Sequence, residues 1–334
     1  MMKGFGRFDP PIDPCANERT RRILAFFEEI YGEKILSGQY TNHGADTETE
    51  LLFRETGRYP AVRGFDFIND SPALSSRTGR DAELAVKWSG EGGLVTFSWH
   101  WFAPCGRPAF YAEHTDFDLS KAVTTLDVAS LPPEELDALW RDGRITTECR
   151  LLLRDIDAIS VRLRWLEEQN VTVLWRPLHE AAGGWFWWGS WGRDAYLWLW
   201  KLMVRRQNGY HGLHNLLWVW NGQAADWYVG DDQCDILGDD VYVSPRDYGA
   251  QTDRFAALSR CSSRKMAALT ECAVIPDPDE LRREAAGWLW FNVWCREFVT
   301  DEQGRYSEAY TERAVLQKAY HSSLVLTRGD LPAF

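Results

Sequence analysis

Short apolar runs alternate with amphipathic helical stretches along almost the whole sequence. The runs are rich in β-branched and aromatic residues, as strands are. Eight of them stand out: Ile35–Tyr40, Ala61–Phe67, Leu94–Trp101, Val171–Leu178, Leu216–Trp220, Ile236–Val243, Met266–Thr270 and Trp288–Trp294. The clearest helical stretches are Glu18–Tyr31, Asp155–Gln169 and Asp194–Gln207. Eight strand-then-helix repeats, with no G-x-G-x-x-G after the first run, favour an α/β fold of the closed (β/α)8 TIM barrel type over an open doubly wound sheet.

The 334 residues are interpreted as a single domain, because no linker or internal repeat divides them. We expect an N-terminal arm over residues 1–15 and a (β/α)8 catalytic domain over residues 16–334. Roughly 70 residues separate the third run from the fourth, which is long for such a connection. The segment Phe102–Arg150, with a short helix near Glu134–Arg141, is therefore predicted to form an excursion on the C-terminal face, where barrel active sites are built.

The net charge of −12 makes nucleic acid and anionic membrane surfaces improbable partners, because both carry negative charge. No apolar run reaches 18 residues, and the sequence begins MMKGFGRFDPPIDPC without an apolar signal segment. The seven cysteines are scattered, which fits reduced thiols. We therefore expect a cytoplasmic monomer, or a secreted protein if a signal peptide has been removed from the chain.

Polar residues follow the ends of the predicted strands, where they would line the C-terminal mouth of the barrel. They are Asp66, His100, Arg176, His179, Glu180, Asn221, Asp240, Tyr242 and Glu271. The fourth run is the sharpest case, because an apolar strand gives way abruptly to Arg176, His179 and Glu180. Such groups at the end of a buried strand indicate a functional site.

Two carboxylates, Glu180 and Glu271, end the fourth and seventh runs and would face each other across the mouth. Paired carboxylates suit acid/base and nucleophile chemistry at a glycosidic bond: about 5–5.5 Å apart for retention of configuration and about 6.5–9.5 Å for inversion. The alternative is structural, in which the two carboxylates only pair with Arg176 or cap helices. Similarly, His100 could be a core histidine, and Asp66 could only brace Arg63 or Arg176.

Tryptophan is unusually abundant, with 18 residues, of which 11 lie between Trp165 and Trp227. Such rings can fill a core or form platforms for sugars. Trp198 and Trp200 have helical spacing and are predicted to be core, as are the strand residues Trp175, Trp218 and Trp220. In contrast, Trp185, Trp187 and Trp188 follow a Gly-Gly pair on the predicted catalytic loop. There we favour ligand stacking, at least for Trp185.

The motifs at the strand ends resemble glycoside hydrolase family 26, the family of retaining β-mannanases. The resemblance is carried by RPLHEAAGGWFWWG (176–189), SWHWFAP (98–104), RGFDF (63–67), DDVY (239–242), LTE (269–271) and FNVW (291–294). It covers the sequence from about Leu36 to Trp294. It implies a (β/α)8 barrel that hydrolyses β-1,4-mannosidic bonds in mannan or manno-oligosaccharides through a covalent glycosyl-enzyme intermediate, without a cofactor or a metal.

The resemblance implies that Glu180 is the general acid/base and Glu271 the nucleophile, with His179 orienting Glu180. Glu180 must be neutral to act as an acid, and a nearby carboxylate with apolar tryptophan walls raises its pKa. Glu271 must stay ionised, and a hydroxyl donated by Tyr242 favours its charged form.

The substrate-binding residues implied by the same resemblance surround this pair. Tyr242 and Asp240 would touch the sugar at subsite −1, where His100 and Trp294 would also lie. Trp185 would form the aromatic platform at subsite +1. Arg176 is also expected to be a substrate-binding residue.

Other functions remain open at this stage. The family also includes β-1,3-xylanases and mixed-linkage glucanases, which strand-end motifs cannot separate from mannanases. A non-catalytic carbohydrate-binding barrel is a further alternative, although both carboxylates are present. A zinc site drawn from His43, His100, His179 and Asp240 is disfavoured, because no H-x-H or H-E-x-x-H spacing occurs.

Overall fold

The predicted strands close into a parallel barrel. The computed structural model describes residues 8–74 and 79–334. The barrel strands are β2 (Gly38–Tyr40), β3 (Val62–Asp66), β4 (Leu94–Ser98), β5 (Val173–Arg176), β6 (Leu216–Trp220), β7 (Ile236–Val241), β8 (Met266–Cys272) and β9 (Phe291–Val293). Each strand pairs with the next in sequence order, and β2 pairs with β9 to close the cylinder. The predicted (β/α)8 fold is confirmed.

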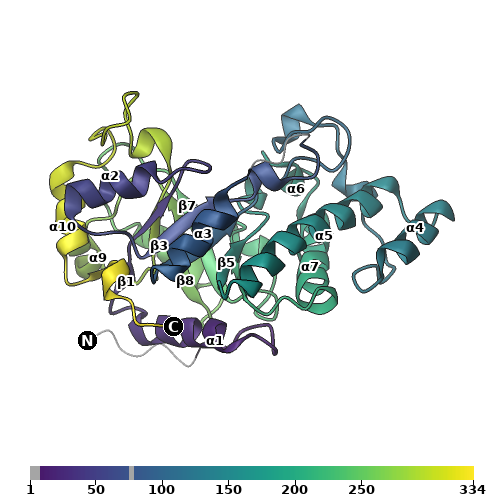
Figure 1. Cartoon of the computed structure of the whole chain (residues 1–334), viewed down its shortest axis with the longest axis horizontal. Coiled ribbons are helices and arrows are strands. Elements are labelled where there is room, and N and C mark those ends of the chain that lie inside the picture. The colour runs from purple at the N-terminus through teal and green to yellow at the C-terminus, as the bar shows by residue number, and fades with distance from the viewer. Residues whose placement is uncertain (1–7, 75–78) are drawn as a thin grey trace.

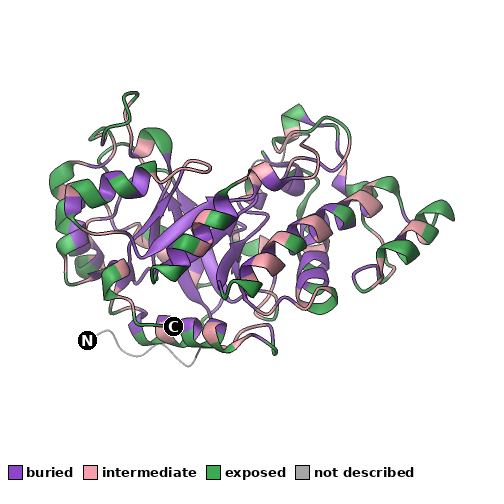
Figure 2. Ribbon diagram, viewed as in Figure 1, coloured by how far each residue is buried: buried purple, intermediate pink, exposed green. Residues whose placement is uncertain are grey.

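Helices lie outside this barrel, and most of them bury one face toward it while their outer faces are exposed (Figures 1 and 2). They are α1 (Glu18–Ile30), α2 (Thr47–Thr56), α3 (Asp81–Gly90), α4 (Pro133–Arg141), α5 (Thr147–Glu168), α6 (Trp187–Ser190), α7 (Arg193–Val204), α8 (Thr252–Ser259), α9 (Pro278–Glu284) and α10 (Arg313–His321). Among the described residues, no helix is both long enough and apolar enough to cross a membrane.

Capping residues explain where helices α1 and α5 begin. The side chain of Asn17 accepts a hydrogen bond from the amide of Thr20 at the start of α1. Thr146 caps α5 in the same way by accepting from the amide of Cys149. Helix α5 therefore begins at Thr147, eight residues before the predicted start at Asp155.

The first predicted run, Ile35–Tyr40, is divided between two sheets. Strand β1 (Ile35–Leu36) pairs outside the barrel with β10 (Val325–Leu326), and only β2 belongs to the barrel. The division occurs at Ser37, whose amide donates to Leu326 while its carbonyl accepts from Val62 of β3. The prediction of one continuous barrel strand is wrong because the chain changes partners at this residue.

The tryptophans predicted as core fill the interior between strands and helices. Trp175, Trp218, Trp220 and Trp200 are fully buried, and Trp198 is partly buried against the same core. The N-terminal arm also packs on the barrel where it is described, over residues 8–15. Asp9 of the arm pairs with Arg264 and Lys265, just before β8. The predicted residues 1–7 of the arm lie outside the described part of the chain.

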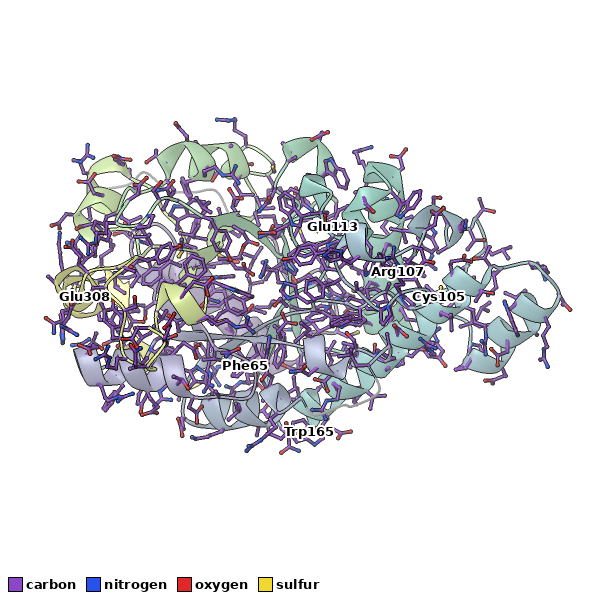
Figure 3. All side chains as sticks on the ribbon, turned by 90° about the horizontal axis from the view of Figure 1, so that it is seen from above. Phe65, Cys105, Arg107, Glu113, Trp165 and Glu308 are labelled. Atoms are coloured by element: carbon purple, nitrogen blue, oxygen red, sulfur yellow. The ribbon has the colours of Figure 1, made fainter. Side chains whose placement is uncertain are left out.

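The predicted excursion leaves the barrel after β4 and returns at the start of α5. It contains α4, which projects farthest from the barrel (Figure 1). Seen from above, its residues Cys105 and Arg107 lie on the right of the molecule, and Glu308 lies at the left edge (Figure 3). Tyr111 forms an antiparallel bridge with Phe186. The excursion is thus joined directly to the loop that carries Trp185.

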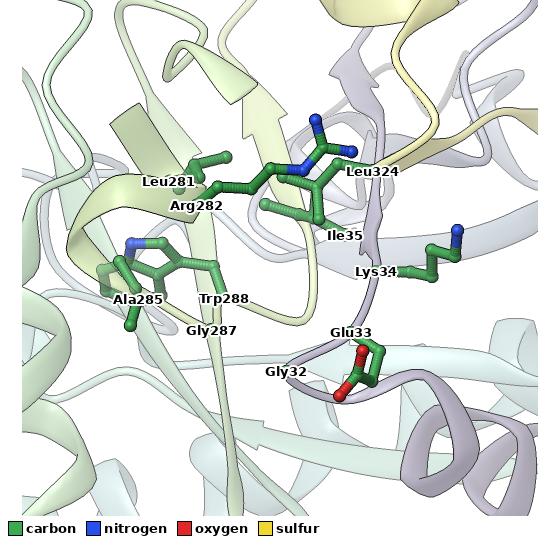
Figure 4. A pocket seen from close by; sticks show the side chains of 11 residues that line it. Gly32, Glu33, Lys34, Ile35, Leu281, Arg282, Ala285, Gly287, Trp288 and Leu324 are labelled. Carbon is green, nitrogen blue, oxygen red and sulfur yellow. The ribbon is translucent and has the colours of Figure 1, made fainter. Parts of the chain in front are cut away.

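A hollow opens at the opposite end of the barrel, among loops that precede the strands. Lys34, Arg282, Trp288 and Leu324 are among the residues that line it (Figure 4). Catalytic residues of (β/α)8 enzymes lie at the carboxyl ends of the strands, so this hollow is remote from the expected site.

Candidate active site

Glu180 and Glu271 meet at the C-terminal mouth of the barrel. Glu180 lies four residues beyond the end of β5, and Glu271 is the penultimate residue of β8. One carboxylate oxygen from each of Glu180, Asp240 and Glu271 lies within 4.8 Å of the other two. An oxygen–oxygen distance of at most 4.8 Å fits the spacing of about 5–5.5 Å between the carboxyl groups of retaining glycosidases and is shorter than the about 6.5–9.5 Å of inverting enzymes.

The backbone around Glu180 is held in an unusual conformation. Leu178 and Glu180 have φ values of 54° and 55°, in the left-handed region that non-glycine residues rarely adopt. Glu180 is held there because its amide donates to the carbonyl oxygen of Asn221 at 2.8 Å and also contacts Asn221 Oδ1 at 3.2 Å. Such strain is concentrated at functional sites, where surrounding contacts compensate for its free-energy cost.

Arg176, at the end of β5, is the central cation of the site and is completely buried. Its guanidinium forms ion pairs with Asp240 at 2.8 Å and with Glu271, and it donates to the hydroxyl of Tyr40 at 3.1 Å. The other oxygen of Asp240 accepts a hydrogen bond from Thr270 at 2.7 Å. Glu271 thus does pair with Arg176, as the alternative of a purely structural role assumed. This ion pair nevertheless lies inside the mouth of the barrel, beside Glu180.

Glu271 is held by two donors. Arg176 binds Oε1, and the hydroxyl of Tyr242 donates to Oε2 at 2.6 Å. Burial and the neighbouring Asp240 raise the pKa of Glu271 to about 7, although Arg176 and Tyr242 both favour the charged form. The pKa of Glu271 is therefore higher than that of an ordinary glutamate, because desolvation outweighs the two donors.

Glu180 is the weaker acid of the two carboxyl groups. Burial, Asp240 and Glu271 raise its pKa to about 9, while Arg176 and the indole of Trp185 act in the opposite direction. Near neutral pH Glu180 is thus protonated and Glu271 loses its proton first. Neighbouring carboxylates with pKa values in this order can supply a general acid and a nucleophile.

His100 lies beside this pair and is held by Asp66. The Nδ1 atom of His100 hydrogen-bonds the carboxylate of Asp66, which also accepts from the backbone amide of His100 at 3.0 Å. Burial alone would raise the pKa of Asp66. The attraction and hydrogen bonds of His100 outweigh burial and lower this pKa to about 2. The suggestion that Asp66 braces Arg63 or Arg176 is wrong, because those cations pair with Asp46 and with Asp240 and Glu271.

The other predicted binding residues also gather at this mouth. The rings of His100 and His179 lie 4.7 Å apart, and the ring of Trp294 lies 6.0 Å from His100. His179 is buried, and burial together with the charge of Arg176 lowers its pKa well below the ordinary range. His179 is therefore neutral at physiological pH.

The three tryptophans of the catalytic loop divide into one exposed ring and two buried ones. Trp185 is 43% exposed, and its indole nitrogen donates to Glu180 Oε2 at 2.9 Å. Trp187 and Trp188 are fully buried, and their indole nitrogens donate to backbone carbonyls of Trp101 and His179. Of the three, only Trp185 is therefore exposed enough to stack on a ligand, because helix α6 turns the rings of Trp187 and Trp188 into the core.

Three carboxylates at this mouth have the spacing of cation ligands. Within the described ranges, Glu180, Asp240 and Glu271 are the one group with the spacing of metal ligands. The histidines considered for zinc are not in that group, since His43 pairs with Asp81 and His100 with Asp66. The guanidinium of Arg176 already supplies positive charge between Asp240 and Glu271.

Three further residues contact the site and are missed by the sequence argument. Tyr40 reaches Arg176 from β2, Thr270 reaches Asp240 from β8, and Gln223 reaches Glu180 from the loop after β6. Tyr40 and Thr270 end apolar runs and look like strand residues in the sequence. Gln223 could have been found, because it lies three residues beyond the end of a predicted strand.

Comparison with known proteins agrees with this geometry. The model of glycosyl hydrolase family 26 matches residues 12–330, almost the whole chain. The chain belongs to glycosyl hydrolase family 26. The resemblance seen in the strand-end motifs is thereby confirmed.

Several similar proteins are named as mannanases. A mannan endo-1,4-β-mannosidase of Thermothelomyces thermophilus is 37% identical over 331 residues, which cover 96% of this chain and 62% of that protein. The chain thus spans less than two thirds of this relative. A GH26-CBM35 β-(1,4)-mannanase of Podospora anserina superposes with a TM-score of 0.86 at 34% identity, covering 99% of this chain and 70% of that one.

A second solved structure matches over nearly its whole length. It is a β-mannanase from a symbiotic protist of the termite Reticulitermes speratus, in complex with gluco-manno-oligosaccharide. It superposes with a TM-score of 0.84 at 30% identity and covers 98% of this chain and 99% of that one.

Proposed function

We propose that this protein hydrolyses β-1,4-mannosidic bonds of mannan or manno-oligosaccharides with retention of anomeric configuration. The observation that carries the proposal is the close approach of Glu180 and Glu271, within 4.8 Å, at the mouth of a family 26 barrel. The names of its relatives, which are mannan endo-1,4-β-mannosidases, support mannan as the substrate.

The proposed reaction has two steps. In the first, Glu180 gives its proton to the glycosidic oxygen while Glu271 attacks the anomeric carbon and the leaving sugar departs. In the second, Glu180 takes a proton from water, which attacks the anomeric carbon and releases Glu271. The raised pKa of Glu180 suits the first step, because the group is protonated near neutral pH.

The surrounding residues are proposed to bind the sugar on either side of the scissile bond. His100, Trp294, Asp240 and Tyr242 would contact the sugar whose anomeric carbon is attacked. Trp185, with its exposed ring beside Glu180, would stack on the leaving sugar. Arg176 would act mainly by holding Asp240 and Glu271 in place.

The experiment that tests the substrate is a comparison of products from mannopentaose, mannan, lichenan and β-1,3-xylan with the purified protein. We expect manno-oligosaccharides from the first two and negligible products from the others. Faster release of sugars from lichenan or β-1,3-xylan would contradict the choice of mannan while leaving the two-carboxylate mechanism intact.

A further inference from the structure

Gln223 contacts the predicted acid/base directly. Its side-chain nitrogen donates to Oε1 of Glu180 at 3.3 Å and also lies 3.4 Å from the carbonyl oxygen of Asp240. Trp185 donates to Oε2, the other oxygen of Glu180, at 2.9 Å. Both carboxylate oxygens therefore accept hydrogen bonds, which is the arrangement that an ionised glutamate requires.

The loop Asn221–Gln223 is attached to the acid/base segment at the backbone as well. The amide of Glu180 donates to the carbonyl of Asn221, and the amide of Ala182 donates to the carbonyl of Gly222 at 3.1 Å. These bonds hold the backbone of the Asn221–Gln223 loop against the backbone that carries Glu180. A small change in the Gln223 side chain should therefore alter mainly its contacts with the carboxylate of Glu180 and with the carbonyl of Asp240.

Gln223 adopts a backbone conformation that suits glycine better. Its φ of 61° lies in the left-handed region, where a side chain adds a free-energy cost that glycine avoids. Positions of this kind are concentrated at functional sites, and Gln223 combines one with a direct contact to Glu180.

We propose that Gln223 is a positioning residue that stabilises the ionised form of Glu180 during the reaction. The proposal rests on the proposed hydrolysis, in which Glu180 alternates between acid and carboxylate. The NH2 group of Gln223 donates to Oε1 of Glu180, and such a donor stabilises the carboxylate more than the neutral acid. A donor that favours the carboxylate assists transfer of the proton from Glu180 to the leaving oxygen.

Other groups also shift the pKa of Glu180, and a test of Gln223 must leave them unchanged. Those that face Glu180 are Asp240 from β7, Glu271 from β8, Arg176 from β5, Tyr242 just beyond β7 and Trp185 on its own loop. A change of Gln223 leaves these side chains in the protein, and it removes the contacts of the Gln223 amide with Glu180 and with the carbonyl of Asp240. A difference between wild type and a Gln223 variant can therefore be assigned to the amide.

The first measurement is the pH dependence of kcat/KM on mannotetraose for wild type, Gln223→Met and Gln223→Gly. Loss of one hydrogen bond to a charged group should move the alkaline limb up by about one pH unit and lower kcat/KM roughly tenfold. Gln223→Gly relieves the positive φ, so it should fold even if Gln223→Met does not. The matched control is Gln317→Met, which removes an exposed amide that donates to the carbonyl of Glu55.

The second measurement does not depend on activity. In protein labelled with ¹³C at glutamate carboxyl groups, the signal missing from Glu180→Gln identifies Glu180, and its titration midpoint is followed with pH. The midpoint should rise in both Gln223 variants and stay at the wild-type value in Gln317→Met. A midpoint and an alkaline limb that both coincide with wild type would overturn the role of Gln223. Wild-type protein without activity on any mannan would instead contradict the proposed hydrolysis, and the titration would still test the contact.

Discussion

The hydroxyl of Tyr242 donates a 2.6 Å hydrogen bond to Oε2 of Glu271, opposite the oxygen that Arg176 binds. The two donors fix the direction of the carboxylate and favour its charge, against a burial that favours the neutral acid. Reactivity of Glu271 as a nucleophile therefore depends on how well these donors compensate for desolvation.

Tyr242→Phe should lower kcat and move the acidic limb of kcat/KM to higher pH by about one unit. The direction follows because the lost hydroxyl favours ionised Glu271, so its removal raises the pKa of that group. The pH profile on mannotetraose measures the shift. Tyr248→Phe is the matched control, since Tyr248 donates to Glu312 in another tyrosine–glutamate pair. An unmoved acidic limb would mean that Tyr242 does not tune Glu271.

Removal of each carboxylate should have a different effect on aryl β-mannosides. Glu271→Ala should abolish turnover of every substrate, whereas Glu180→Ala should retain turnover of aryl glycosides whose leaving group needs no protonation. Added azide should then give a β-configured mannosyl azide with Glu180→Ala. Equal loss of activity in both variants on aryl glycosides would show that the two roles are assigned wrongly.

Trp185 and Trp188 lie on the same loop but should respond differently to truncation. Trp185→Ala removes an exposed ring and should lower kcat/KM by about 1–3 kcal/mol, by analogy with other stacking platforms, with little change in Tm. Trp188→Ala removes a fully buried ring and should reduce stability by about 3–5 kcal/mol. Kinetics and thermal unfolding of both variants distinguish the two cases, and similar losses of Tm would place Trp185 in the core.

Glu180→Gln should raise thermal stability at pH 8 and have little effect at pH 4.5. The folded protein holds the Glu180 proton up to about pH 9, whereas the unfolded chain releases it near pH 4.3. Between these values the folded state binds more protons, so stability contributed by this group falls as pH rises, and glutamine removes the penalty. Tm at both pH values measures the effect, with the exposed Glu113→Gln as control. An equal Tm change at both pH values would contradict the raised pKa.

The residues at the strand ends could be predicted from the sequence because a barrel active site places polar and ionisable side chains directly after apolar strands. Glu180 and Glu271 interrupt such runs, and both lie where the pattern places them. Residues whose roles depend on side-chain direction could not be predicted in this way. Trp187 and Trp188 share a loop with Trp185, yet a short helix buries both, and the pairing of Asp66 with His100 depends on packing between β3 and the end of β4.

The measurement that tests the central claim most directly is proton NMR of the first product released from mannopentaose by the purified wild-type protein. Carboxylate oxygens of Glu180 and Glu271 within 4.8 Å predict double displacement, so the β-anomer should form first and the α-anomer should follow only by mutarotation. Initial release of the α-anomer would contradict a retaining mechanism through Glu271.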